Sequence, residues 1–260
     1  MRVSLNVTDY DWPDGPTVGL DRIARAADEA GLDTLWVSDH LMQVAPGSRP
    51  DGEMLEAYTT LGYVAARTGR IRLGTMVSAV TYRPPALLVK AVSTLQTLSD
   101  GRAWLGIGAG YHEEEARTLG LPLPPVAERF DRLESTLRRA KGAAPILVGG
   151  AGEKRTLRLV AEHADACNLF DIPDGGATVR HKLDVLRRHC EEVGRPYRDV
   201  EKTVSTRLEP GESTGSFVAR CTALGALGIG HVVVITTGPW TEDAVACLAA
   251  AVPELGEEHR

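Results

Sequence analysis

The sequence lacks the features that mark membrane, zinc-stabilised and nucleic-acid-binding proteins. No apolar run approaches the roughly 20 residues that a membrane span needs, and the first residues are too polar for a signal peptide. The four cysteines include no Cys-x-x-Cys pair, which argues against a structural zinc site. No block of basic residues would neutralise nucleic-acid phosphates. We therefore expect a cytoplasmic protein with reduced thiols and with no membrane or nucleic-acid partner.

The composition is typical of a folded protein. The chain has 260 residues, of which 43% are hydrophobic, 25% are charged and only 5% are aromatic. This hydrophobic fraction is too high, and the charges are too evenly mixed, for a disordered chain. The net charge of -6 mainly favours solubility. We take residues 1–260 as one domain, which suits this length.

Short apolar runs alternate with helical patterns along the whole chain. The runs that we expect to be strands are 3–7, 34–38, 71–77, 103–107, 146–148, 166–170, 200–206 and 232–235. Eight strands in strict alternation with helices predict an α/β fold of the (β/α)₈ TIM-barrel type, whose usual length is about 250 residues. The alternative is an open doubly wound sheet, which favours a glycine-rich turn after the first strand. Here Asn6-Val7-Thr8-Asp9 follows that strand, so we predict the barrel.

Active sites of such barrels lie at the carboxyl ends of the strands. The side chains expected there are small, amide-bearing or hydroxyl-bearing, with few histidines. No lysine ends a strand, which argues against Schiff-base chemistry. There is no His-x-His pair or dense acidic cluster, so we predict no metal site. Such a pocket suits a planar cofactor that brings its own reactivity.

The glycine-rich segment 149–152 is the clearest local signal. It follows an apolar strand and is expected to open a helix, whose backbone amides and positive end attract anions. Lys154, Arg155 and Arg158 would add positive charge. A tight turn with a solvated basic face explains the pattern equally well. The other glycine run, 106–110, follows the fourth strand rather than the first, so it is a weak dinucleotide signal. Its small residues would instead let a flat ring approach the backbone.

His40 is the strongest candidate for proton transfer. It directly follows the second strand, beside Asp39, and histidine acts as acid or base near neutral pH. Asp39 would either orient His40 or cap the following turn. His112 with Glu113, Glu114 and Glu115 is more typical of a helix start, where acidic residues are favoured.

Several ordered segments carry a family resemblance. They are 31–40 (GLDTLWVSDH), 54–61 (MLEAYTTL), 71–77 (IRLGTMV), 83–86 (RPPA), 98–102 (LSDGR), 105–110 (LGIGAG), 128–134 (ERFDRLE), 146–150 (ILVGG) and 164–168 (ADACN). In this order and spacing they resemble the luciferase-like monooxygenase superfamily, on its coenzyme F420-dependent oxidoreductase side.

The resemblance implies a barrel that holds a flavin or deazaflavin at the strand ends. Asp39 and His40 would face the ring, and a non-prolyl cis peptide at Met76-Val77 would lie behind it. The residues implied or expected to bind the cofactor are Asn6, Thr75, Met76, Val77, Gly108, Ala109, Gly110, Gly149, Gly150, Ala151, Gly152 and Lys154. The family commonly forms dimers, so we expect a homodimer.

Two departures from the family pattern stand out. Relatives usually carry a long insertion before the fifth strand that often helps cover the pocket, whereas residues 138–145 alone fill this gap. The shortened insertion predicts a more open site, a lid from a partner chain, or poor cofactor binding. Tyr111 and His112 also stand where many deazaflavin relatives have tryptophan or glutamate and asparagine.

The leading hypothesis is an oxidoreductase that moves a hydride between coenzyme F420 and a small organic substrate. His40 would stabilise charge or move a proton. An FMN-dependent monooxygenase that uses molecular oxygen is the first alternative. A non-catalytic barrel that binds a flavin or deazaflavin is the second.

Overall fold

The structure is a computed structural model, and it describes residues 1–44, 48–49 and 51–257. Its strands are β1 (Arg2–Val7), β2 (Thr34–Val37), β3 (Arg72–Thr75), β4 (Ser78–Ala79), β5 (Ala103–Gly108), β6 (Ile146–Gly149), β7 (Ala166–Phe170), β8 (Glu201–Arg207) and β9 (His231–Ile235). They form one parallel sheet in the order β3-β2-β1-β9-β8-β7-β6-β5-β4. A further pairing of Leu73 with Ala103 joins β3 to β5 and closes the sheet. The predicted barrel is confirmed.

Strands β3 and β4 are two halves of one barrel strand. The nine strands of the sheet therefore make up an eight-stranded barrel. Both halves pair in parallel with β5. The Met76-Val77 peptide between them is cis, as the family resemblance implied. The single run predicted at 71–77 is therefore interrupted by a bulge, which lies next to the strand ends where a site was expected.

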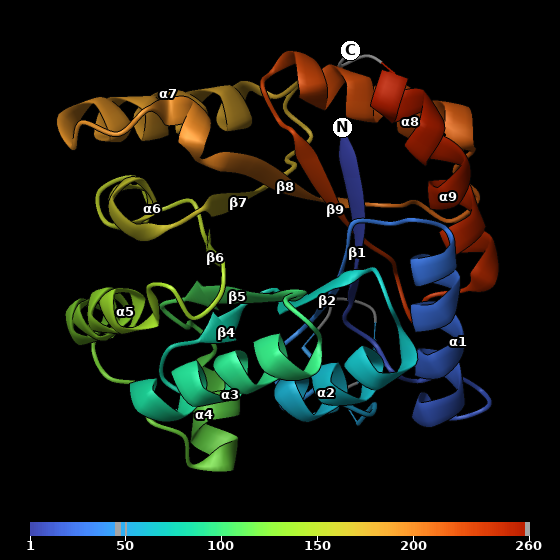
Figure 1. Cartoon of the computed structure of the whole chain (residues 1–260), viewed down its shortest axis with the longest axis horizontal. Helices are drawn as coiled ribbons and strands as arrows, with labels where there is room; N and C mark the ends of the chain where they lie inside the picture. Colours follow the sequence, from blue (N-terminus) through green and yellow to red (C-terminus); the bar gives the residue numbers. More distant parts are fainter. Residues whose placement is uncertain (45–47, 50, 258–260) are drawn as a thin grey trace.

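Helices surround the barrel (Figure 1). They are α1 (Pro16–Glu29), α2 (Ala57–Arg67), α3 (Pro85–Leu98), α5 (Val126–Ala140), α6 (Thr156–His163), α7 (Ala177–Glu192), α8 (Thr214–Ala226) and α9 (Glu242–Glu257). Pro16 and Pro85 occupy first helical positions, where a missing N–H costs nothing. A short extra helix, α4 (Glu113–Leu119), precedes α5, and a 3₁₀ turn (Tyr197–Asp199) precedes β8. No helix in the described part of the chain could cross a membrane.

A layer of buried apolar side chains, including two tryptophans, fills the middle of the barrel. The buried residues of this layer are Trp36, Trp104, Leu147, Ala166 and Val233. Trp36 and Trp104 meet edge to face, with ring centroids 6.3 Å apart. A Cβ at Gly74 would lie only 2.5 Å from the Trp36 ring, so the glycine makes room for this plug. The plug separates the two ends of the barrel.

The shortened connection before β6 lies at the amino-terminal end of the barrel. It runs from the end of α5 to the start of Ile146, and residues 141–146 border a hollow of about 1170 Å³ that also involves Arg2 and Gly230. Active sites of barrels lie at the opposite, carboxyl-terminal end. The expectation that this connection affects access to the pocket is therefore corrected, because an α-to-β connection reaches the strand where it begins.

Candidate active site

A cavity of about 480 Å³ opens at the carboxyl ends of the strands. Its volume is within the range of cofactor and small-molecule sites. The sequence-predicted residues that line it are Asn6, Asp39, His40, Met76, Val77, Gly108, Ala109, Gly110, Gly149, Gly150, Ala151 and Gly152. The fold thus brings twelve predicted residues together, and their roles toward a ligand stay predictions.

Two predicted residues, Thr75 and Lys154, are not part of the cavity lining. The Thr75 hydroxyl donates to the Gly106 carbonyl at 2.8 Å and accepts from the Ser78 hydroxyl at 3.0 Å, so it fastens β3 to β5. Lys154 is exposed in the turn before α6. Thr75 therefore supports the cavity from behind, and contact between Lys154 and a cofactor stays a prediction.

The glycines of β5 and β6 are explained by the cis bulge. A Cβ at Gly106 would lie 1.8 Å from the Thr75 carbonyl oxygen, which no side chain could tolerate. A Cβ at Gly149 would lie 2.9 Å from both methyl groups of Val77, and one at Gly108 would lie 3.1 Å from one of them. The run 106–110 is therefore not a dinucleotide motif. Its glycines let the bulge pack against the neighbouring strands at the cavity wall.

Asp39 is bound to Arg83 rather than to His40. Its side chain has no solvent exposure, and both its oxygens accept hydrogen bonds from Arg83, at 2.6 and 2.8 Å. Arg83 also pairs with Glu56 and lies over the Tyr58 ring, 4.9 Å from its centroid. Burial raises the pKa of Asp39, and the Arg83 guanidinium opposes that rise. The suggestion that Asp39 orients His40 is therefore wrong.

The acidic residue that contacts His40 is Glu115. Its fully buried carboxylate lies 2.6 Å from His40 Nδ1 and also accepts from the Tyr82 hydroxyl and from the backbone N–H groups of Leu41 and Met42. Burial alone would raise the pKa of Glu115, but these hydrogen bonds outweigh it and lower that pKa to about 2. The side chain is therefore a carboxylate at neutral pH.

Sequence reasoning missed Glu115, because three consecutive acidic residues are also what a helix start favours. The helix start itself is confirmed: the His112 ring accepts from the Glu115 backbone N–H at 3.1 Å and caps α4. Only the third acidic residue of the run is buried, while Glu113 and Glu114 are exposed. Arg83 was missed as well, although its segment is part of the family resemblance.

The second nitrogen of His40 points away from Glu115 toward the cavity rim. His40 Nε2 lies 3.3 Å from the Tyr111 hydroxyl, and both residues line the cavity. The two rings meet edge to face with centroids 5.7 Å apart. Tyr111 is 70% exposed. His40 thus stands between a buried carboxylate and a hydroxyl at the cavity mouth.

The turn between β6 and α6 has the form of an anion site. The helix that follows it begins at Thr156. Within the described residues, the backbone N–H groups from Ala151 to Thr156 donate to no protein acceptor, and the first bond of the turn runs from Leu157 N–H to the Gly152 carbonyl at 3.0 Å. Free amides at a helix start bind phosphate well.

Two of the three basic side chains near this turn, Arg155 and Arg158, are already engaged. Arg155 donates to Asp131 at 2.6 Å and lies over the Phe130 ring of α5, and Arg158 pairs with Glu162. The expectation that Arg155 meets an anionic ligand is therefore not supported by its position. The attraction for an anion therefore rests on the backbone amides, the helix end and the exposed Lys154.

The polar cavity floor contains one unsatisfied acceptor. Asn168 donates to the Ser205 hydroxyl at 2.8 Å and accepts from Thr203 at 2.8 Å. Asn6 is 4% exposed, and its side-chain oxygen has no partner among the described residues. An unpaired buried acceptor is costly. A ligand N–H or O–H in the cavity would satisfy it.

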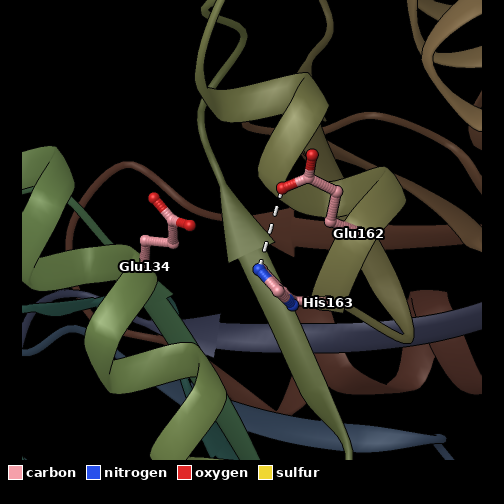
Figure 2. Close-up of side chains that lie close together, drawn as sticks. All are labelled: Glu134, Glu162 and His163. Atoms are coloured by element: carbon pink, nitrogen blue, oxygen red, sulfur yellow. Dashed lines mark ion pairs between the residues drawn. The ribbon is translucent and has the colours of Figure 1, made fainter. Parts of the chain in front are cut away.

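One cluster of metal-ligand residue types occurs in the described chain, away from this cavity. Figure 2 shows Glu134 on α5 facing Glu162 and His163 at the end of α6. Their possible ligand atoms all lie within 4.8 Å of one another. Glu134 already pairs with Arg138, and Glu162 with Arg158. These arginines neutralise the carboxylates, so the cluster carries no metal assignment.

Comparison with known proteins shows what the chain resembles. The family model described as luciferase-like monooxygenase matches residues 16–144. Over residues 16–144 the chain is therefore similar to this luciferase-like family. A curated relative from Nakamurella multipartita, named F420-dependent glucose-6-phosphate dehydrogenase, is 39% identical over 225 residues, which covers 75% of this chain and 64% of the relative.

Another relative with the same name, from Kineococcus radiotolerans, is 42% identical over 123 residues, or 47% of this chain and 35% of the relative. The chain thus spans only about one to two thirds of the length of these relatives. Among solved structures, an F420-dependent secondary alcohol dehydrogenase with an F420-acetone adduct superposes with a TM-score of 0.82. The two chains are 14% identical, and the match covers 98% of this chain and 99% of the other. At this identity the similarity shows the shared fold alone.

Proposed function

We propose that this luciferase-like protein transfers a hydride between coenzyme F420 and a small organic substrate. The observation that carries the proposal is one cavity that joins three parts: the free amides of the β6–α6 turn, the wall at Met76-Val77, and His40. The relatives named F420-dependent support the choice of cofactor, although they are matched over part of their length.

The residues of the cavity fit a deazaflavin. The glycines beside Val77 leave a flat wall for a ring, and the Asn6 oxygen offers an acceptor to a ring N–H. The amides from Ala151 to Thr156 would hold a phosphate. The bound deazaflavin would supply the hydride chemistry.

The remaining lining favours a small neutral substrate. His40 offers Nε2 for the proton of an alcohol, or for the protonation of a carbonyl oxygen. Around it lie hydroxyls, amides and apolar side chains, including Tyr111, Phe170 and Ile235. The protein would orient the substrate carbon and move the proton.

Two titrations test the cofactor, with coenzyme F420 and with FMN, followed by intrinsic tryptophan fluorescence. We expect F420 to bind and Gly152→Ala to weaken its affinity about tenfold or more, or about 1.4 kcal/mol. The added methyl would lie 2.8 Å from the Thr156 hydroxyl, inside the amide turn. Gly230→Ala, which has open space at the other end of the barrel, is the matched control.

The outcomes separate the candidates. Binding of FMN alone would contradict the proposal and favour an oxygen-using flavoenzyme. Binding of neither cofactor would also contradict it. The homodimer stays a proposal as well, to be checked by light scattering of the purified protein.

A further inference from the structure

The contacts of His40 define its hydrogen-bonding state. The Glu115 carboxylate has no hydrogen to donate, so the 2.6 Å contact requires the hydrogen on His40 Nδ1. In a neutral imidazole the other nitrogen is then an acceptor. The Tyr111 hydroxyl lies 3.3 Å from that nitrogen and is able to donate to it.

Glu115 is itself held on several sides. One oxygen accepts from the N–H groups of Leu41 and Met42, and the other from His40 and Tyr82. These donors come from the β2–α2 and β4–α3 connections, while Glu115 comes from the extra helix α4. A fully buried carboxylate satisfied by four donors has one stable position.

We propose that Glu115 is a positioning residue that fixes His40 as the Nδ1–H tautomer and presents Nε2 to the cavity as the proton acceptor of the reaction. This inference rests on the proposed function. In the oxidation direction the substrate hydroxyl would give its proton to His40 Nε2, while a bound deazaflavin would accept the hydride from the substrate carbon. The alcohol becomes a carbonyl and the imidazole becomes an imidazolium, which returns its proton to solvent.

The Tyr111 hydroxyl marks the position of the reacting hydroxyl. It is the one polar atom that contacts His40 Nε2 among the described residues, and it belongs to a side chain that is 70% exposed at the rim. A substrate hydroxyl that replaces it would meet the same acceptor without any movement of His40 or Glu115.

The substitution Glu115→Gln should invert the tautomer. The glutamine carbonyl would stay with the Leu41 and Met42 amides, so its NH₂ group would face His40 Nδ1. Nδ1 must then accept, and Nε2 carries the hydrogen and loses its function as a base. Glu114→Gln is the matched control, because Glu114 is an exposed carboxylate in the same helical turn.

The test uses ¹⁵N-histidine NMR of the whole chain, with the His40 signals assigned by their loss in His40→Gln. We expect Nδ1–H in the wild type and in Glu114→Gln, and Nε2–H in Glu115→Gln. With F420 and a small secondary alcohol, kcat of Glu115→Gln should fall about 100-fold or more, as for a lost acid–base group. Its KM and F420 affinity should change less than threefold.

Two results would overturn the inference. One is an Nε2–H tautomer in the wild type, which needs no Glu115 variant and so decides the matter even if Glu115→Gln fails to fold. The other is a kcat for Glu115→Gln within twofold of that for Glu114→Gln. Failure of the wild type to bind F420 would instead overturn the proposed function, while the tautomer would still report on Glu115.

Discussion

Gly106 offers the sharpest test of how the cavity wall is built. An alanine Cβ at this position would lie 1.8 Å from the Thr75 carbonyl oxygen and 3.3 Å from a Val77 methyl, whereas ordinary contacts begin at 3.4 Å. The nearest atom belongs to the backbone of β3, which pairs with both β2 and β5 and cannot move alone. Relief therefore requires displacement of the strand or of the bulge.

Gly106→Ala should be strongly destabilising. Overpacking in a core usually costs about 1–3 kcal/mol, and a clash with backbone belongs at the upper end, so we expect about 3 kcal/mol. At about 2–4 °C per kcal/mol for a domain of this size, the melting temperature should fall by about 6–12 °C.

Gly62→Ala is the matched control. Gly62 lies inside α2 with no atom within 4 Å of an added Cβ, so alanine there should stabilise the helix by about 0.5–1 kcal/mol. Both substitutions are Gly→Ala, and their effects on the unfolded chain are alike. Urea unfolding of the two variants and the wild type measures the difference. A Gly106→Ala variant within 0.5 kcal/mol of the wild type, a margin typical of surface changes, would refute the packing argument.

Two further predictions concern buried charges. Arg83→Met should cost about 3–5 kcal/mol, because it leaves Asp39 buried without its partner. Burial raises the folded-state pKa of Asp39, so its ionisation weakens the fold as pH rises. Urea unfolding should therefore show that Arg83→Met lowers the free energy of unfolding more at pH 8 than at pH 5. An equal loss at both values would contradict this. Burial opposes ionisation of Glu201, but its bond to His231, 2.7 Å from Nδ1, outweighs burial and lowers its pKa. The stability that this bond adds is present above the unfolded-state pKa of a glutamate, about 4.3, and is lost as pH falls below that value. The difference in melting temperature between wild type and Glu201→Gln should therefore shrink from pH 7 to pH 3, and an unchanged difference would count against it.

Local patterns in the sequence were enough to predict the barrel. The strand predicted at 166–170 coincides with β7. Burial on both sides makes each parallel strand a short apolar run, and amphipathic helices fill the intervals. Since strand ends define the active end of such a barrel, most of the cavity lining followed from the same patterns.

The interactions that define the site were beyond such patterns. Asp39 and Arg83 are 44 residues apart, and His40 and Glu115 are 75 apart. Adjacency in sequence suggested that Asp39 would hold His40, but consecutive residues after a strand point in different directions. Their partners come from other β–α connections, which meet only when the barrel closes.

The sequence by itself determined the order of strands and helices, the end of the barrel where chemistry is possible, and the side chains available there, because these depend on local periodicity and on chain direction. Only the tertiary structure decided that Glu115 binds His40, that Gly106 and Gly149 make room for the cis bulge, and that the short connection before β6 lies far from the cavity. These features depend on contacts between segments that are distant in sequence, and such contacts exist only once the sheet has closed.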